Sequence, residues 1–208
     1  MMEKPYKIVN NQRVFNFKKT LRYIQYLGKS KYGDQFKIHR SDVLTFHRLI
    51  IYMIHEERQC KKYNIDLNKG ILLIGPIGSG KTTIMNLLRV FLFKEDFYHI
   101  KSSRDIALEY QREGVEIINR YGKKHTPLFI DDLGVESNSK FYGNECNTIG
   151  EILLQRYDLL TNYQIVTHAT TNLNADELEE LYGKRVRSRL REMFNLISFP
   201  TTTKDKRK

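Results

Sequence analysis

The sequence predicts an α/β fold in which a parallel sheet of five strands lies between helices. Three observations support this prediction. Short apolar segments alternate with helical patterns over residues 41–200, a glycine-rich motif joins the first of these segments to a helix, and polar or acidic residues follow the later segments. Strands that alternate with helices generally form a parallel sheet covered on both faces.

The composition is that of a globular protein without membrane spans. The chain has 208 residues, 40% of them hydrophobic and 28% charged, which suffices for one α/β domain with short extensions. No apolar stretch approaches the roughly 20 residues that cross a bilayer, and residues 1–19 lack the apolar core of a signal peptide. Cys60 and Cys146 have neither metal-ligand spacing nor a disulfide framework. We therefore expect a cytoplasmic protein with no membrane partner.

Positive charge is concentrated at the two ends of the chain. The net charge is +11, with +8 over residues 1–40, +7 over residues 184–208 and −4 between them. This distribution fits an anionic polymer held by the terminal segments, and it fits basic solvated tails equally well. We divide the chain into three parts: a basic, aromatic N-terminal extension at 1–40, an α/β domain at 41–200 and a basic disordered tail at 201–208.

The N-terminal extension interleaves cations with aromatic rings such as Tyr23 and Tyr26. Rings among Lys and Arg residues can stack on the bases of single-stranded nucleic acid. Alternatively, Leu21, Ile24 and Leu27 can pack one amphipathic helix onto the domain. We favour packing.

The first half of the domain is predicted as a helix followed by two strands with a helix between them. Ser41 and Asp42 mark a helix start, and apolar residues then recur at helical spacing until a charged end near Lys62. The segments that follow are a strand at 70–74, a helix at 84–93 and a strand at 97–100.

The second half continues the alternation. Ser102 and Ser103 cap a helix that runs towards residue 121 with a bend near Gly114, and Asn174 begins a helix that Gly183 is expected to end. The remaining segments are strands at 128–132, 164–172 and 195–199, a loop at 135–147 that contains Gly143, and helices at 149–160 and 185–193.

The strongest motif in the chain is a phosphate-binding loop. It matches G-x-x-x-x-G-K-[ST] in full and stands between an apolar strand and a helix, which is the context such a loop requires. Its glycines let backbone N–H groups approach an anion, and the following helix directs its positive end at that anion. Lys81 would reach the β- and γ-phosphates and Thr82 would ligate Mg²⁺. The predicted binding residues are Gly75, Pro76, Ile77, Gly78, Ser79, Gly80, Lys81, Thr82 and Thr83.

Acidic and amide side chains follow two later strands. Asp131 ends an apolar strand about fifty residues after Lys81, where a carboxylate can hold the magnesium ion, and Asp132 beside it can polarise an attacking water. Asn172 ends the next strand, and in a parallel sheet that end faces the ligand crevice. Asn172 could hold the water or the γ-phosphate, or it could instead cap the next helix.

A cluster of arginines follows Gly183. Arg185 and Arg189 are four residues apart and therefore share one helical face. One of them could act on the nucleotide of a neighbouring subunit, as arginine fingers do. Contact with nucleic acid or solvent is the alternative.

These motifs together resemble the core of AAA+ ATPases. Residues 75–83, 129–134, 169–172 and 183–190 occur in the order and at the spacings of that core. They most resemble the branch that contains bacterial replicative helicase loaders of the DnaC and DnaI type and transposition ATPases of the IstB type. The likeness covers about residues 41–200.

The resemblance implies ATP as the nucleotide and assigns a role to each candidate. Asp131 would be the acid on the metal side and Asp132 the acid that activates water. Asn172 would be the sensor and Arg185 the finger presented to a neighbouring subunit, with Arg189 in reserve. The resemblance also implies an ATP-dependent homo-oligomer that contacts single-stranded DNA and places a replicative DNA helicase on it.

The sequence departs from the AAA+ pattern in three places. Asp132 stands where many AAA+ proteins have Glu, so its carboxylate is one methylene shorter. No C-terminal lid domain with a sensor arginine is expected after the last strand. The N-terminal extension is short for the helicase-docking domain of larger loaders.

We therefore expect an AAA+ protein that binds and slowly hydrolyses ATP in an assembly and helps to load a replicative helicase onto single-stranded DNA. One alternative is an IstB-type transposition helper that acts on double-stranded DNA with a transposase. The other is a scaffold that ATP switches without hydrolysis.

Overall fold

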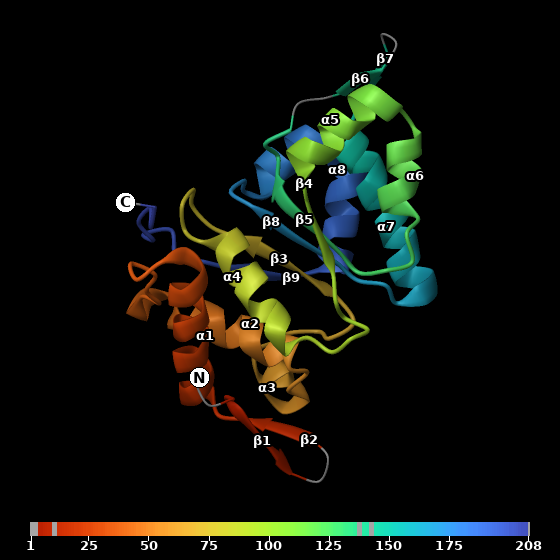
Figure 1. Ribbon diagram of the computed structural model, residues 1–208. Helices are drawn as coiled ribbons and strands as arrows, with labels where there is room; N and C mark the ends of the chain where they lie inside the picture. The colour runs from red at the N-terminus through yellow and green to blue at the C-terminus, as the bar shows by residue number, and fades with distance from the viewer. Residues whose placement is uncertain (1–3, 10–11, 137–138, 142–143, 208) are drawn as a thin grey trace.

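The protein is built on a five-stranded parallel sheet. A computed structural model describes residues 4–9, 12–136, 139–141 and 144–207 (Figure 1). The strand order is β4-β5-β8-β3-β9, and every neighbouring pair is parallel. This confirms the predicted fold class. The strands are β3 (Gly70–Ile74), β4 (His99–Ser102), β5 (Leu128–Leu133), β8 (Thr167–Thr171) and β9 (Phe194–Ser198).

Helices cover both faces of this sheet and bury two separate cores. Side chains alternate between the faces of a strand, so Ile71 and Leu73 of β3 join one core and Leu72 between them joins the other. The first core packs against α1 (Phe17–Tyr32), α2 (Val43–Met53), α3 (Glu57–Lys62) and α4 (Lys81–Leu88). The second packs against α5 (Ser103–Glu113), α6 (Glu116–Gly122), α7 (Thr148–Tyr163) and α8 (Ala175–Met193).

Several local predictions are confirmed. Asn174 caps α8 with its side chain, and Glu177 completes the capping box. Gly114, with a φ of 66°, separates α5 from α6 where the bend was expected. In α1, Ile24 is fully buried within the first core. The amphipathic packing helix predicted for the N-terminal extension is therefore present.

The N-terminal extension also holds a hairpin that the sequence did not predict. Strands β1 (Tyr6–Val9) and β2 (Gln12–Phe15) pair antiparallel before α1, as Figure 1 shows, and the Phe15 ring of β2 packs edge-on against Phe91. Aromatic residues of the extension pack against the first core, which favours the packing role over base stacking for them. They are Phe15, Phe17, Tyr23, Tyr32 and Phe36.

Some boundaries differ from the prediction. Helix α4 begins at Lys81, directly at the glycine-rich loop, and the strand expected at 97–100 starts only at His99. Gly183 has a non-helical φ of 82° and ψ of 162°, so it separates two helices within α8 as predicted, and the second helix continues to Met193. Between 135 and 147, strands β6 (Ser139–Phe141) and β7 (Asn144–Cys146) form a hairpin where a loop was expected. Gly143 lies outside the described residues.

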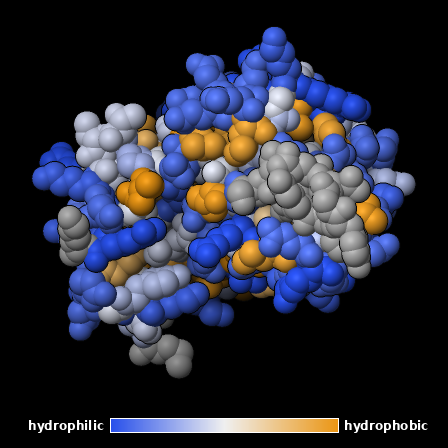
Figure 2. Space-filling view, turned by 90° about the horizontal axis from the view of Figure 1, so that it is seen from above, coloured by the Kyte–Doolittle hydropathy of each residue, from blue (hydrophilic) through white to orange (hydrophobic). Residues whose placement is uncertain are grey.

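The surface is mainly hydrophilic. Figure 2 shows one face on which apolar side chains gather only in small groups among charged and polar ones. Exposed apolar residues include Ile8, Ile77 and Leu196. Within the described ranges, no helix combines the length and the apolar character needed to cross a membrane.

A buried histidine makes part of this fold sensitive to acid. His168 of β8 is 1% exposed, and its Nδ1 accepts a hydrogen bond from the Ile71 N–H at 3.1 Å. This bond needs an unprotonated Nδ1, and burial lowers the pKa of His168 to about 4. An unfolded chain binds this proton near pH 6.5, so the stabilisation is complete above that pH and is lost as the pH falls towards 4.

We expect the free energy of unfolding to fall by up to about 3 kcal/mol between pH 6.5 and 4 because of His168. Urea denaturation of the wild type and of His168→Asn across this range measures the effect, since Asn keeps an acceptor but does not titrate. His99→Asn, at an exposed histidine, is the control. An equal acid loss in the wild type and in His168→Asn would contradict the assignment.

Candidate nucleotide site

The predicted phosphate-binding loop connects β3 to the first turn of α4. Gly78 and Gly80 have φ values of 75° and 91°, a backbone region that favours glycine. Gly80 is the residue before α4, so the free N–H groups of the helix start at the end of the loop. The structure therefore gives residues 75–83 the backbone of an anion-binding turn at a helix N-terminus.

Lys81 is held within this loop. It is 6% exposed, and its Nζ donates to the backbone oxygens of Gly75 at 2.9 Å and Pro76 at 3.2 Å. Burial lowers the pKa of Lys81, while the nearby carboxylates of Asp132 and Asp131 raise it. The ammonium group thus lies beside the predicted phosphate position and is only partly balanced by acidic groups.

A bulge at the end of β5 turns both predicted acids towards the loop. Ile130 pairs with Ala169 of β8 and Leu133 with Thr171, so Asp131 and Asp132 together face the single residue Thr170. The Thr170 hydroxyl donates to Asp131 Oδ1 at 2.6 Å and accepts from the Asp132 N–H at 2.9 Å. One threonine therefore fixes both acidic residues.

Asp131 also joins the strand edge to the phosphate loop. Its Oδ1 accepts a second hydrogen bond from the Thr82 hydroxyl at 2.9 Å. Asp131 is 9% exposed, and burial raises the pKa of its carboxyl even though Thr170 and Thr82 both lower it. A cation at this position would favour the charged carboxylate.

This pair of oxygens fits a magnesium ion. Hydroxyl and carboxylate oxygens are ligands that Mg²⁺ prefers, and it commonly binds through one or two side chains together with substrate phosphates. No group of three or more His, Cys, Asp or Glu side chains is placed to hold a metal among the residues described here. Thr82 and Asp131 would therefore share the ion with water and a bound phosphate.

Asp132 lies at the rim of the site in an unusual backbone conformation. Its φ is 55°, which is uncommon for a residue other than glycine but is tolerated by Asp. The Ser103 hydroxyl donates to its carbonyl oxygen at 2.6 Å. These bonds hold the backbone of Asp132 while its side chain lines a cavity.

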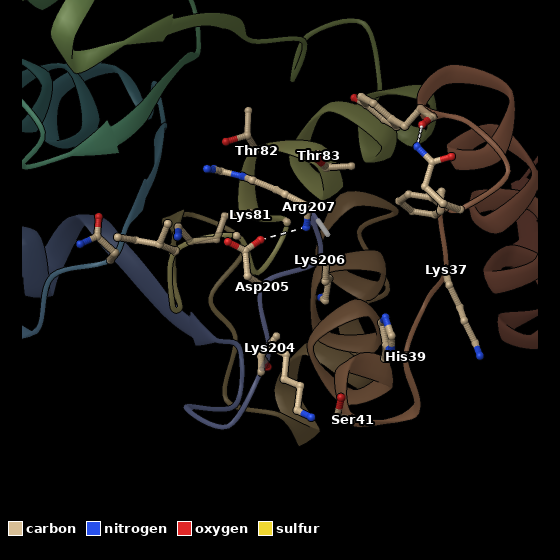
Figure 3. A pocket seen from close by; sticks show the side chains of 18 of the residues that line it. Lys37, His39, Ser41, Lys81, Thr82, Thr83, Lys204, Asp205, Lys206 and Arg207 are labelled. Carbon is tan, nitrogen blue, oxygen red and sulfur yellow. Dashed lines mark hydrogen bonds between the residues drawn. The ribbon is translucent and has the colours of Figure 1, made fainter.

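That cavity has a volume of about 860 Å³ and lies over the phosphate loop (Figure 3). Asn172 lines it from the end of β8, so the structure brings this predicted residue to the same place as Lys81, Thr82 and Asp132. The other walls come from the segment after α1 and from the segment after β9. They include Tyr32, Gln35, Phe36, Lys37, His39, Ser41, Thr202, Thr203, Lys204, Asp205, Lys206 and Arg207.

The arginine candidates do not line this cavity. Arg185 is exposed on α8, which packs on the opposite face of the sheet from α1. Arg189 stacks over the Tyr157 ring, with its guanidinium carbon 4.9 Å from the ring centre. Within one subunit, therefore, neither arginine is brought to the other predicted site residues.

Sequence reasoning missed several residues of the site. Thr170 lies within the predicted strand 164–172, but its bridging role depends on the bulge in β5, which the sequence does not indicate. The segment 201–207 was expected to be a disordered tail. Instead, the Lys206 N–H donates to the Gly78 carbonyl at 3.0 Å, and the segment lies against the loop. Its alternating charges gave no signal of this contact.

Comparison with known proteins identifies the fold. Residues 52–199 match a family model described as an AAA domain. The crystal structure of the DnaC helicase loader is 19% identical with a TM-score of 0.54, over 80% of this chain and 95% of that one. The crystal structure of DnaI is 20% identical with a TM-score of 0.57, over 86% and 94%.

Two further structures share the fold. A putative primosome component from Streptococcus pyogenes serotype M3 is 20% identical with a TM-score of 0.57, over 89% of this chain and 91% of that one. AMPPCP-bound DnaA from Aquifex aeolicus is 17% identical with a TM-score of 0.53, over 82% and 50%. A sequence search of curated proteins finds no match. Since the family model covers more than half of the chain, the predicted AAA+ resemblance is confirmed, and this chain belongs to the AAA domain family.

Proposed function

We propose that this protein binds ATP with Mg²⁺, hydrolyses it slowly within an assembly, and helps to load a replicative DNA helicase onto single-stranded DNA. The observation that carries the nucleotide part is the contact of 2.9 Å between Thr82 and Asp131, next to Lys81 at the start of α4. It places a metal-ligand pair beside a buried cation at a helix N-terminus.

Each predicted site residue has a defined task in this proposal. The loop N–H groups and Lys81 bind the phosphates, and Thr82 and Asp131 hold the metal, which neutralises charge on the β- and γ-phosphates when it is bound. Asp132 orients and polarises the attacking water. Asn172 contacts that water or the γ-phosphate from the end of β8.

Arg185 completes the site of a neighbouring subunit in this proposal. It is exposed on α8 and lies outside the cavity of its own subunit, which is what a residue acting on a neighbour requires. A guanidinium group stabilises the charge of phosphoryl transfer when an assembly forms. Hydrolysis would therefore depend on an ATP-dependent homo-oligomer.

The helicase and DNA partners are supported by similarity and charge. Two of the similar structures are those of the DnaC helicase loader and of a putative primosome component. The exposed cations of α1 and α8 lie on opposite faces of the sheet, so they form two surfaces and not one. Single-stranded DNA would then contact one of these two surfaces.

Removal of the loop cation tests nucleotide binding. We expect Lys81→Ala to weaken ATP binding at least tenfold, since it removes a buried cation that would contact phosphate. Equilibrium titration with a fluorescent ATP analogue measures this effect, and Lys123→Ala at an exposed lysine is the control. Undiminished affinity in Lys81→Ala would remove the basis of the proposal.

Mixed assemblies test the role of Arg185. Arg185→Ala and Asp132→Asn should each abolish most turnover when present alone, since one removes the finger and the other the acid. Mixing the two variants leaves some interfaces with both groups intact, so part of the activity should return. Phosphate release with single-stranded DNA present measures it. Normal turnover by Arg185→Ala alone would contradict the proposed action of Arg185 on the neighbouring subunit's nucleotide. If the wild type binds ATP but never turns it over, the hydrolysis part fails.

The DNA preference is tested by direct competition. We expect single-stranded DNA to bind more tightly than duplex of equal length at matched salt. The affinity should fall steeply as salt rises, because lysines and arginines displace counterions from phosphates. Fluorescence anisotropy at two or more salt concentrations measures both quantities. Tighter binding of the duplex would contradict the single-strand part and favour a transposition helper.

A further inference from the structure

The segment after β9 is bound against the phosphate loop. Residues 201–207, which we call the basic segment, follow β9 and pass beside the loop, where Figure 1 shows the C-terminal end of the trace. The Lys206 N–H donates to the Gly78 carbonyl at 3.0 Å, and the Lys206 Nζ donates to the Ser79 carbonyl at 2.6 Å. A single residue thus holds two consecutive carbonyls of the loop.

A buried carboxylate fixes this residue in place. Asp42 is fully buried at the start of α2, and its Oδ2 lies 2.7 Å from the Lys206 Nζ. A buried carboxylate without a cation is strongly unfavourable, so the domain and the basic segment stabilise each other at this point. The Lys206 Nζ also lies 4.6 Å from the centre of the Phe199 ring.

The hydrogen bonds from Lys206 to the Gly78 and Ser79 carbonyls affect how the loop can bind an anion. The C=O and N–H groups of a planar trans peptide point in opposite directions. The Ser79 C=O and the Gly80 N–H belong to one peptide, so the Gly80 N–H points away from Lys206, which holds that carbonyl. Lys206 therefore favours the backbone orientation that a phosphate needs.

The basic segment also brings a second cation into the cavity. Arg207 lines the cavity together with Lys81, and in Figure 3 its side chain extends towards Lys81 and Thr82. The charge of Arg207 contributes to lowering the pKa of Lys81, after burial as the main cause. Two cations that repel each other across an open cavity favour a polyanion between them.

Asp205, the single acidic residue of the basic segment, does not cancel the positive charge of the segment. Asp205 lies so close to Gly78 that a Cβ at this position would collide with Asp205 Oδ1. The same oxygen accepts a hydrogen bond from the Arg207 N–H at 2.9 Å. Asp205 thus shapes the turn that presents Arg207. Lys204, Lys206 and Arg207 leave the segment with more positive than negative charge.

We propose that the basic segment is part of the nucleotide site, with Lys206 clamped by Asp42 to hold the phosphate loop in its anion-binding form and Arg207 contacting the phosphates. The proposal rests on the nucleotide binding proposed above. It makes residues 201–207 a positioning and binding element, in place of the disordered tail that the sequence suggests.

Arg207 is tested by comparing two nucleotides. Arg207→Ala should bind ATP about tenfold more weakly than the wild type, in the range expected for one hydrogen bond to a charged group, and should lose less affinity for ADP. Arg58→Ala on α3 removes an equal charge at an exposed position outside the cavity and should change neither. Unchanged ATP affinity in Arg207→Ala would overturn the contact. Tighter ATP binding would show that the segment blocks the site, which also overturns it.

The clamp is tested by a double-mutant cycle. Lys206→Met and Asp42→Asn should each weaken ATP binding by about tenfold, and the double variant should be little weaker than either alone, because both remove the same clamp. Thermal unfolding and circular dichroism show whether each variant is folded. If Asp42→Asn fails to fold, the ATP affinity of Lys206→Met alone tests the clamp. Lys206 is partly exposed, so its replacement is expected to leave the protein folded.

Two outcomes would overturn the clamp: additive losses in the double variant, or wild-type affinity in folded Lys206→Met. Failure of the underlying nucleotide proposal looks different, because then the wild type itself would not bind ATP and Lys81→Ala would change nothing. The two proposals can therefore fail separately.

Discussion

The arrangement of the candidate site depends on one carboxylate oxygen. Asp131 Oδ1 accepts hydrogen bonds from the hydroxyls of Thr82 and Thr170 and so connects β5, the start of α4 and β8. These three elements are far apart in the sequence, and each brings a different part of the site. If this oxygen moved, the phosphate loop would lose its contact with the strand edge, and Asp132 would lose the neighbour that shares its threonine.

Because Asp131 and Lys81 are buried, each of them depends on a nearby group of opposite charge. The carboxyl of Asp131 is buried enough that its pKa is raised, while burial lowers the pKa of Lys81. Both charged forms are therefore disfavoured by their surroundings, and each is favoured by an opposite charge. A phosphate chain with a divalent cation supplies a negative group for Lys81 and a positive one for Asp131. Asp42 is also buried, and Lys206 is the cation that lies beside its carboxylate.

The local parts of the site could be predicted from the sequence, because they depend on residues close together in the chain. The glycine spacing of 75–83, the apolar run before Asp131 and the capping pattern at Asn174 each specify a backbone segment with little help from elsewhere. The order of strands and helices was predicted for the same reason. The position of Asn172 followed from the rule that parallel strands end at one edge.

The missed features depend on contacts between distant segments. The bulge in β5 is set by pairing with β8, and the residue types at positions 131 and 132 do not predict it. The pairing of Lys206 with Asp42 joins residues at opposite ends of the domain, and a lysine among other cations carries no sign of a buried partner.

The central claim is that Asp131 and Thr82 form the metal side of a nucleotide site, and magnesium dependence tests it most directly. Calorimetric titration of ATP into the wild type and into Asp131→Asn, each with Mg²⁺ and with chelator, gives four affinities. The account predicts that Mg²⁺ tightens ATP binding to the wild type by tenfold or more and that Asp131→Asn loses most of this gain. An equal gain from Mg²⁺ in both proteins, or none in the wild type, would contradict it.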